Sequence, residues 1–288
     1  MSNIINKNNC FEFDKATGTI IKYNSFGETN IIIPNEIEGV VVKRIGNSAF
    51  EQCQDIKFVD IQEGLKYIDP NAFNRCNNLE YINIPKGVES IGENAFKMCI
   101  NLKFIIIQEG IKSIKERAFY ECERLRSVSI ADGLEYIESN VFSKCVSLKD
   151  ISMPNSIKEI GERAFNECTS LKTISIPESV KDIANEMFSG CTGLESISIP
   201  KGVENIGYRA FSRCTSLKTI SIPESVKEIR ESVFNGCTGL ESISIPESVK
   251  EIKESAFNGC TSLKSIRIPE GVENIEYGVF NGCTGLKT

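Results

Sequence analysis

A single spacing dominates the sequence: eleven of the 12 cysteines recur every 23 residues, from Cys53 to Cys283. A phenylalanine stands three positions before each of them, the first being Phe50, and the pattern runs without insertion from Ile45 to the end of the chain. A fixed period of this length is typical of a solenoid, in which units stack because none can bury its own apolar edge alone. We therefore expect one elongated repeat domain.

One unit can be interpreted residue by residue. Over residues 81–84 apolar and polar side chains alternate, which predicts a strand whose Ile82 points inward, and Pro85 ends that strand. Apolar spacings of three and four over residues 92–99 predict one or two turns of α- or 3₁₀-helix. The predicted fold class is an α/β repeat solenoid: a curved stack with a parallel, concave β-sheet and short helical turns on the opposite side.

The motif residues of one unit are Ala164, Phe165, Cys168, Leu171, Ile174, Ile176, Pro177, Val180 and Ile183. This pattern resembles the leucine-rich-repeat superfamily, and most closely the 23-residue class of BspA-like and Treponema pallidum leucine-rich-repeat proteins. The resemblance implies a curved solenoid that binds proteins. It also implies a lead-in segment before the repeats, and many members of the family are secreted or surface-attached adhesins.

The two ends differ from the middle. Residues 1–44 lie outside the period and predict a β-rich N-terminal cap: residues 11–13 and 19–23 suit the strands of a hairpin, and 30–33 and 40–42 suit degenerate first rungs. Residues 45–288 then form about eleven repeats, and no cap follows them. A missing C-terminal cap suits a truncated chain or a fraying last rung. It also suits an open edge that pairs with another copy, giving a homo-oligomer.

The cysteine row allows three interpretations: buried thiols, disulfides or a metal site. Adjacent rungs place neighbouring Cα atoms ~5 Å apart, within reach of a disulfide. Eleven equivalent cysteines cannot all pair, however, and zinc needs four ligands that converge on a point, whereas a ladder offers a line. We expect a row of buried, reduced thiols and no metal.

Targeting signals give a further expectation. The chain begins MSNIINKNNC, without the charged-then-apolar pattern of a signal peptide. No apolar run approaches the ~18 residues of a spanning helix, so we expect no membrane insertion. Together with reduced thiols this predicts a cytoplasmic location. A cell-surface location follows instead if a leader has been removed.

Composition excludes several kinds of chemistry. The chain has no histidine, which rules out Ser-His-Asp and Cys-His catalysis and every zinc site that needs imidazole. The net charge of −6 makes nucleic acid an unlikely partner, because phosphates bind to a basic face. No phosphate loop or catalytic motif is present. We expect neither enzymatic activity nor a cofactor.

The outward strand positions supply a candidate binding site. Most rungs carry serine or threonine there, but the first three carry larger side chains. The candidate protein-binding residues are Phe58, Asp60, Tyr81, Asn83, Phe104 and Ile106. Aromatic residues on a solvent-facing sheet suit a binding hot spot. Two alternatives are that the cap folds over this surface, or that the rings only form a cross-strand ladder.

These observations favour a non-catalytic scaffold that binds another protein. It could be an intracellular adaptor or inhibitor, or an adhesin-like module as the family resemblance implies. The alternative is a structural protein that self-assembles through its uncapped C-terminal edge.

Overall fold

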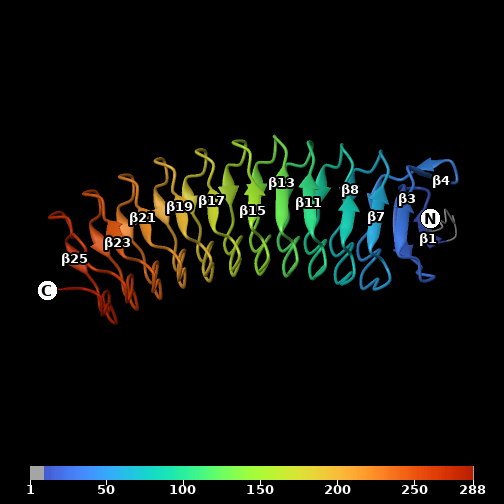
Figure 1. Cartoon of the computed structure of the whole chain (residues 1–288). Coiled ribbons are helices and arrows are strands. Elements are labelled where there is room, and N and C mark those ends of the chain that lie inside the picture. The colour runs from blue at the N-terminus through green and yellow to red at the C-terminus, as the bar shows by residue number, and fades with distance from the viewer. Residues whose placement is uncertain (1–9, 288) are drawn as a thin grey trace.

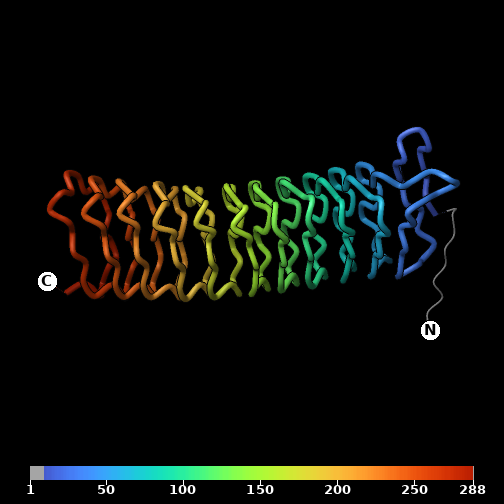
Figure 2. Tube along the Cα trace, turned by 90° about the horizontal axis from the view of Figure 1, so that it is seen from above, coloured from blue at the N-terminus to red at the C-terminus, as the bar shows by residue number. Residues whose placement is uncertain are grey.

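The computed structural model describes residues 10–287, so the first nine residues of the predicted cap and Thr288 lie outside the described part. The chain forms a solenoid of about eleven turns, whose strands make up two faces. The stack follows a shallow arc in Figure 1 and is nearly straight in the perpendicular view of Figure 2. The concave placement predicted for the sheet is not apparent in either view.

The first face, which we call the long-strand face, consists of strands of three or four residues. They are β3 (Asn30–Ile33), β7 (Phe58–Ile61), β9 (Tyr81–Asn83), β11 (Phe104–Ile107), β13 (Ser127–Ile130), β15 (Asp150–Ser152), β17 (Thr173–Ser175), β19 (Ser196–Ser198), β21 (Thr219–Ser221) and β23 (Ser242–Ser244). Paired neighbours are parallel, and from β7 onwards they keep the 23-residue register, so that Phe58 lies opposite Tyr81. The alternation predicted from the sequence is present, since Ile82 is buried between the half-buried Tyr81 and Asn83.

The second face, which we call the short-strand face, was missed by the sequence interpretation. Its two-residue strands are β6 (Arg44–Ile45), β8 (Tyr67–Ile68), β10 (Ser90–Ile91), β12 (Ser113–Ile114), β14 (Tyr136–Ile137), β16 (Glu159–Ile160), β18 (Asp182–Ile183), β20 (Asn205–Ile206), β22 (Glu228–Ile229), β24 (Glu251–Ile252) and β25 (Asn274–Ile275). Ile91 lies outside both the strand predicted over residues 81–84 and the turns predicted over residues 92–99. The structure pairs Ile91 with Ile114 in a parallel ladder.

The N-terminal segment extends the short-strand face. Strands β1 (Phe11–Asp14) and β2 (Thr19–Tyr23) pair antiparallel, and β2 then pairs in parallel with β6. A second small hairpin joins β4 (Glu36–Ile37) to β5 (Val40–Val41). Because β2 supplies backbone partners to β6, the first repeat does not expose an unpaired ladder at this end.

The predicted helical turns are wrong: no α- or 3₁₀-helix occurs between residues 45 and 287. In one rung Asn94 and Met98 have φ of 54° and 58°, whereas helical residues need φ near −60°. The N–H groups of Phe96 and Met98 also donate to Ala118 and Tyr120 of the next rung, both at 2.8 Å. The segment is a series of tight turns whose hydrogen bonds run along the solenoid instead of along a helix axis.

A continuous core runs between the two faces. The phenylalanine rings from Phe50 to Phe257 are fully buried, and each stacks on the ring of the next rung. The centroids of Phe165 and Phe188, for example, lie 5.6 Å apart with planes 4° from parallel. Removing one such side chain from water contributes about 1.5–3 kcal/mol.

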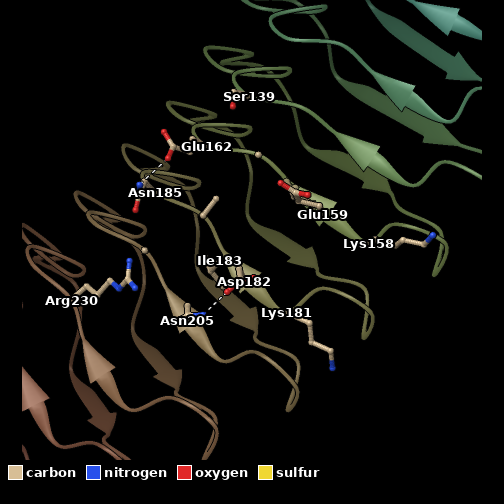
Figure 3. A pocket seen from close by; sticks show the side chains of 14 residues that line it. Ser139, Lys158, Glu159, Glu162, Lys181, Asp182, Ile183, Asn185, Asn205 and Arg230 are labelled. Carbon is tan, nitrogen blue, oxygen red and sulfur yellow. Dashed lines mark hydrogen bonds between the residues drawn. The ribbon is translucent and has the colours of Figure 1, made fainter.

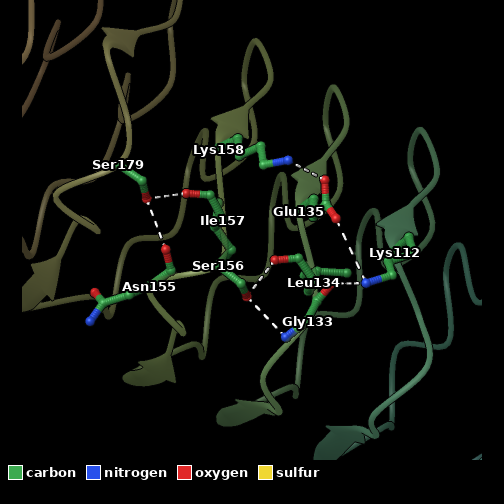
Figure 4. A network of polar contacts seen from close by, with 9 residues as sticks. All are labelled: Lys112, Gly133, Leu134, Glu135, Asn155, Ser156, Ile157, Lys158 and Ser179. Atoms are coloured by element: carbon green, nitrogen blue, oxygen red, sulfur yellow. Dashed lines mark hydrogen bonds and ion pairs between the residues drawn. The ribbon is translucent and has the colours of Figure 1, made fainter.

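Polar contacts join the rungs at the edge that connects the two faces (Figure 4). The Ser156 hydroxyl donates to the Leu134 carbonyl at 2.7 Å and accepts from the Gly133 N–H at 3.0 Å. Glu135 lies between two lysines, 2.6 Å from Lys158 and 3.7 Å from Lys112. Opposite charges on neighbouring rungs therefore pair, although exposed pairs of this kind contribute little.

Candidate protein-binding face

The six candidate residues occupy three consecutive strands of the long-strand face. Phe58 and Asp60 come from β7, Tyr81 and Asn83 from β9, and Phe104 and Ile106 from β11. The strand alternation places them all on one surface because Val59, Ile82 and Ile105 between them point into the core. The structure therefore brings together all six residues that the sequence singled out.

Four of these side chains, Phe58, Tyr81, Phe104 and Ile106, form what we call the aromatic patch. Phe58, Phe104 and Ile106 are 44%, 41% and 48% exposed, and Tyr81 is half-buried. The described part of the N-terminal segment leaves these side chains open to solvent. The Tyr81 and Phe104 rings touch, with centroids 5.2 Å apart and planes at 47°. The rings thus form a cross-strand contact and remain accessible at the same time.

Polar groups border the patch on both sides. Asn83 donates to Asp60 at 3.1 Å and Gln62 donates to the other Asp60 oxygen at 2.8 Å, which fixes the carboxylate beside Phe58. On the opposite side Lys103 forms an ion pair with Glu80 at 2.5 Å. The hydrogen bond from Lys103 holds the pKa of the Glu80 carboxyl below its ordinary value. An apolar centre with a polar rim is the usual anatomy of a protein interface.

The remainder of the long-strand face is different in character. Its outward residues are the exposed side chains of Ser127, Ser129, Asp150, Ser152, Thr173, Ser175, Ser196, Ser198, Thr219, Ser221, Ser242 and Ser244. No large apolar side chain interrupts this stretch. The aromatic patch is therefore a local departure from an otherwise hydroxyl-rich surface built on the same backbone.

The cysteine row is structural. None of the described cysteines forms a disulfide, and those from Cys76 to Cys260 are buried. Each of these thiols donates to the carbonyl of the phenylalanine 26 residues earlier, as Cys76 does to Phe50 at 3.0 Å. Burial raises the pKa of Cys191 to about 12. Thiols held protonated in this way are poor nucleophiles and poor metal ligands.

Exposed apolar side chains also occur at both ends of the described chain, away from the six candidate residues. Ile21, Phe26 and Val41 are exposed in the N-terminal segment. In the last described rung Ile275 is 46% exposed, whereas Ile252 at the same position one rung earlier is fully buried. The repeat pattern could have predicted the exposure of Ile275. At this position the next rung covers the isoleucine side chain, and the structure describes no rung after Ile275.

With the repeat geometry established, comparison with known proteins identifies the family. A model of the BspA type leucine rich repeat region matches in six copies, over residues 19–146, 91–218 and 181–288. The chain belongs to the BspA-type leucine-rich-repeat family. The resemblance inferred from the spacing is confirmed. No curated protein matches the sequence.

Several solved structures share the fold of this BspA-type protein. A leucine rich cell surface protein from Faecalibacterium prausnitzii is 28% identical over 96% of this chain and 91% of its own, with a TM-score of 0.54. The Treponema pallidum leucine-rich-repeat protein is 28% identical over 73% of this chain and 88% of its own, with a TM-score of 0.53. The pneumococcal vaccine antigen PcpA is 19% identical over 94% of this chain and 81% of its own, with a TM-score of 0.61. At this identity the similarity concerns the fold alone.

These matches bear on function and location. Leucine-rich-repeat proteins are generally binding scaffolds, and none of the matches indicates a catalytic family. The similar Faecalibacterium protein is a cell-surface protein, so the cytoplasmic location predicted from the sequence gains no support from the comparisons. Within residues 10–287 no helix has the length and apolar character needed to cross a bilayer.

Proposed function

We propose that this BspA-type protein is a non-catalytic scaffold that binds another protein through the aromatic patch. The observation that carries the proposal is the exposure of Phe58, Phe104 and Ile106 side by side on a rigid sheet. Large apolar side chains that project from a fixed backbone lose little conformational entropy on binding, and they dominate the energy of most interfaces. The partner would supply apolar side chains opposite these residues.

The family favours an adhesin-like, cell-surface role over that of an intracellular adaptor or inhibitor. The similar protein from Faecalibacterium prausnitzii is described as a cell surface protein and is covered almost completely by the match. An extracellular partner is therefore the first to test. The adaptor or inhibitor role would instead require a partner among cytoplasmic proteins.

A pull-down with matched variants tests the proposal. The purified chain is immobilised and offered a cytoplasmic extract and an extract of extracellular proteins, each analysed by mass spectrometry. A Phe58→Ser/Tyr81→Ser/Phe104→Ser variant should capture at least tenfold less of the partner than the wild type does, because it lacks the three rings. The substituted side chains are exposed or half-buried, so the fold should persist, as circular dichroism can verify.

The control variant is Thr173→Ala/Ser196→Ala/Thr219→Ala. It changes three residues of the same outward column on β17, β19 and β21 and leaves the aromatic patch intact. The control should capture the partner as well as the wild type does. Equal capture by the wild type and the serine variant would show that the patch is not the binding site.

A further inference from the structure

The short-strand face carries a polar trough that lies apart from the aromatic patch (Figure 3). Its floor is the position that follows each two-residue strand, where three consecutive rungs carry Gly161, Ala184 and Gly207. The rungs on either side carry Glu138 and Arg230 at this position. Three small residues in succession, bounded by long side chains, leave a hollow of about 650 Å³.

Two rows of polar side chains form the walls of the trough. One row consists of Glu159, Asp182 and Asn205, which are the first residues of β16, β18 and β20. The other row includes Glu162 and Asn185, from the turns that follow these strands. The two rows therefore combine carboxylates, which accept hydrogen bonds, with amides, which both donate and accept them.

The walls are organised as carboxylate–amide pairs. Asn205 donates to Asp182 at 2.6 Å in one row, and Asn185 donates to Glu162 at 2.9 Å in the other. The carbonyl oxygen of Asn185 also accepts the N–H of Tyr208 at 2.9 Å, which fixes the orientation of its amide. A carboxylate accepts several hydrogen bonds and an amide has two donor hydrogens, so both pairs keep capacity for a ligand.

The charges of the trough are mixed. Its lining includes three acids, Glu159, Glu162 and Asp182, and three cations, Lys158, Lys181 and Arg230, of which Lys158 is already paired with Glu135. Such a balance favours neither a polyanion nor a polycation. The apolar side chains that line it, Ile160 and Ile183, point into the core and are buried, so they offer no apolar surface to a lipid or an apolar peptide.

An aromatic side chain continues the trough at one end. Tyr136, the first residue of β14, is exposed and lines an adjoining hollow of about 310 Å³ that shares Glu159 and Gly161 with the trough. The face of a tyrosine ring packs well against polarised C–H groups while its hydroxyl stays in water. Mixed hydrogen-bonding walls beside such a ring are the chemistry that recognises a sugar.

We propose that this trough binds a neutral oligosaccharide along the solenoid axis, with Tyr136 beneath a terminal ring and the carboxylate–amide pairs on the hydroxyl groups. The rungs repeat at ~4.8 Å, close to the length of one pyranose unit in an extended chain. Each rung can therefore meet one sugar residue. The site is independent of the aromatic patch and of the proposed protein partner.

Isothermal titration calorimetry with cellotetraose, chitotetraose, mannotetraose and maltotetraose tests this proposal. At least one of these should bind saturably to the wild type. Ala184→Lys should weaken that binding at least tenfold because it fills the floor, and the fold should tolerate the change since neighbouring rungs carry Glu138 and Arg230 there. Asp182→Ala should weaken it as well by removing one carboxylate.

Two controls make the result specific. Ser198→Lys places the same charged side chain on the long-strand face and should bind as the wild type does, as should the serine variant of the aromatic patch. The proposal fails if none of the four sugars binds, or if Ala184→Lys binds them unchanged. Saturable binding of hexalysine without sugar binding would assign the trough to basic peptides instead and would equally overturn it.

Discussion

The thiol of Cys168 donates a hydrogen bond to the backbone carbonyl of Phe142, with sulfur and oxygen 3.2 Å apart. The two residues belong to adjacent rungs, and both are fully buried. The cysteine therefore does more than fill space, because it gives the Phe142 carbonyl a second hydrogen bond beside the one from the Cys145 N–H at 3.1 Å. The same bond recurs from Cys76 to Cys283 and ties each rung to the one before it.

Replacing this thiol should destabilise the fold. Cys168→Ala removes the second of two hydrogen bonds to the Phe142 carbonyl and opens a small void, so the free energy of unfolding should fall by about 1–3 kcal/mol. Urea denaturation followed by circular dichroism measures the change. Cys53→Ala, at the half-buried first position of the row, should cost less. An equal loss at both sites would argue against the hydrogen bond as the cause.

The thiol row should make stability depend on alkaline pH. Burial raises the pKa of Cys191 and Cys237 from 9.0 to about 12. Below pH 9 both the native and the unfolded chain keep these protons. Above it the unfolded chain loses them while the native state retains them, so unfolding becomes easier as pH rises towards 12, by about 1.4 kcal/mol per pH unit and thiol.

Urea midpoints measured between pH 8 and 10.5 check this dependence. The double variant Cys191→Ala/Cys237→Ala should show a shallower decline than the wild type, since two of the titrating groups are gone. A wild-type midpoint that stays constant to pH 10.5 would contradict the prediction.

The phenylalanine stack should be the most sensitive part of the core. The Phe165 ring lies 5.7 Å from that of Phe142 and 5.6 Å from that of Phe188. Phe165→Ala should lower the free energy of unfolding by about 3–5 kcal/mol, because the cavity opens between two rungs. Phe104→Ala is the matched comparison on the exposed face, and its effect on stability should be well under half as large. Similar losses would mean that Phe104 is structural.

The surface ion pairs should contribute little. Lys158 and Glu135 approach to 2.6 Å, yet the lysine side chain is largely exposed. We expect Lys158→Ala to change stability by less than about 1 kcal/mol, and the difference should vanish in 1 M salt because screening weakens exposed pairs. Thermal unfolding at low and high salt measures it. A loss above 2 kcal/mol that salt does not reduce would refute this estimate.

Some features could be inferred from single residues and their spacing. Strand alternation assigned Ile82 to the core, and this side chain is nearly fully buried. It also placed Phe58 and Phe104 on one exposed surface. These inferences succeed because strand alternation and a fixed period determine which side chains can face the core, whatever the details of the turns.

Other features could not be predicted from the pattern, because they depend on which backbone groups form hydrogen bonds with each other. Spacings of three and four around Phe96 fit a helix equally well, but the N–H of Phe96 donates to Ala118 in the next rung. Nothing in the local sequence specifies that partner. The two-residue ladder through Ile91 was likewise too short to produce a visible alternation.

The sequence alone determined the solenoid, its family, the buried columns and the position of the aromatic patch, since each follows from a repeat that must cover apolar edges by stacking. Only the tertiary structure decided that the turns are not helical, that the Cys168 thiol donates a hydrogen bond to the Phe142 carbonyl, and that Gly161 and Gly207 lie on the floor of a trough. Those features arise between rungs, from atoms 22 or more residues apart, where register and backbone direction decide which groups meet.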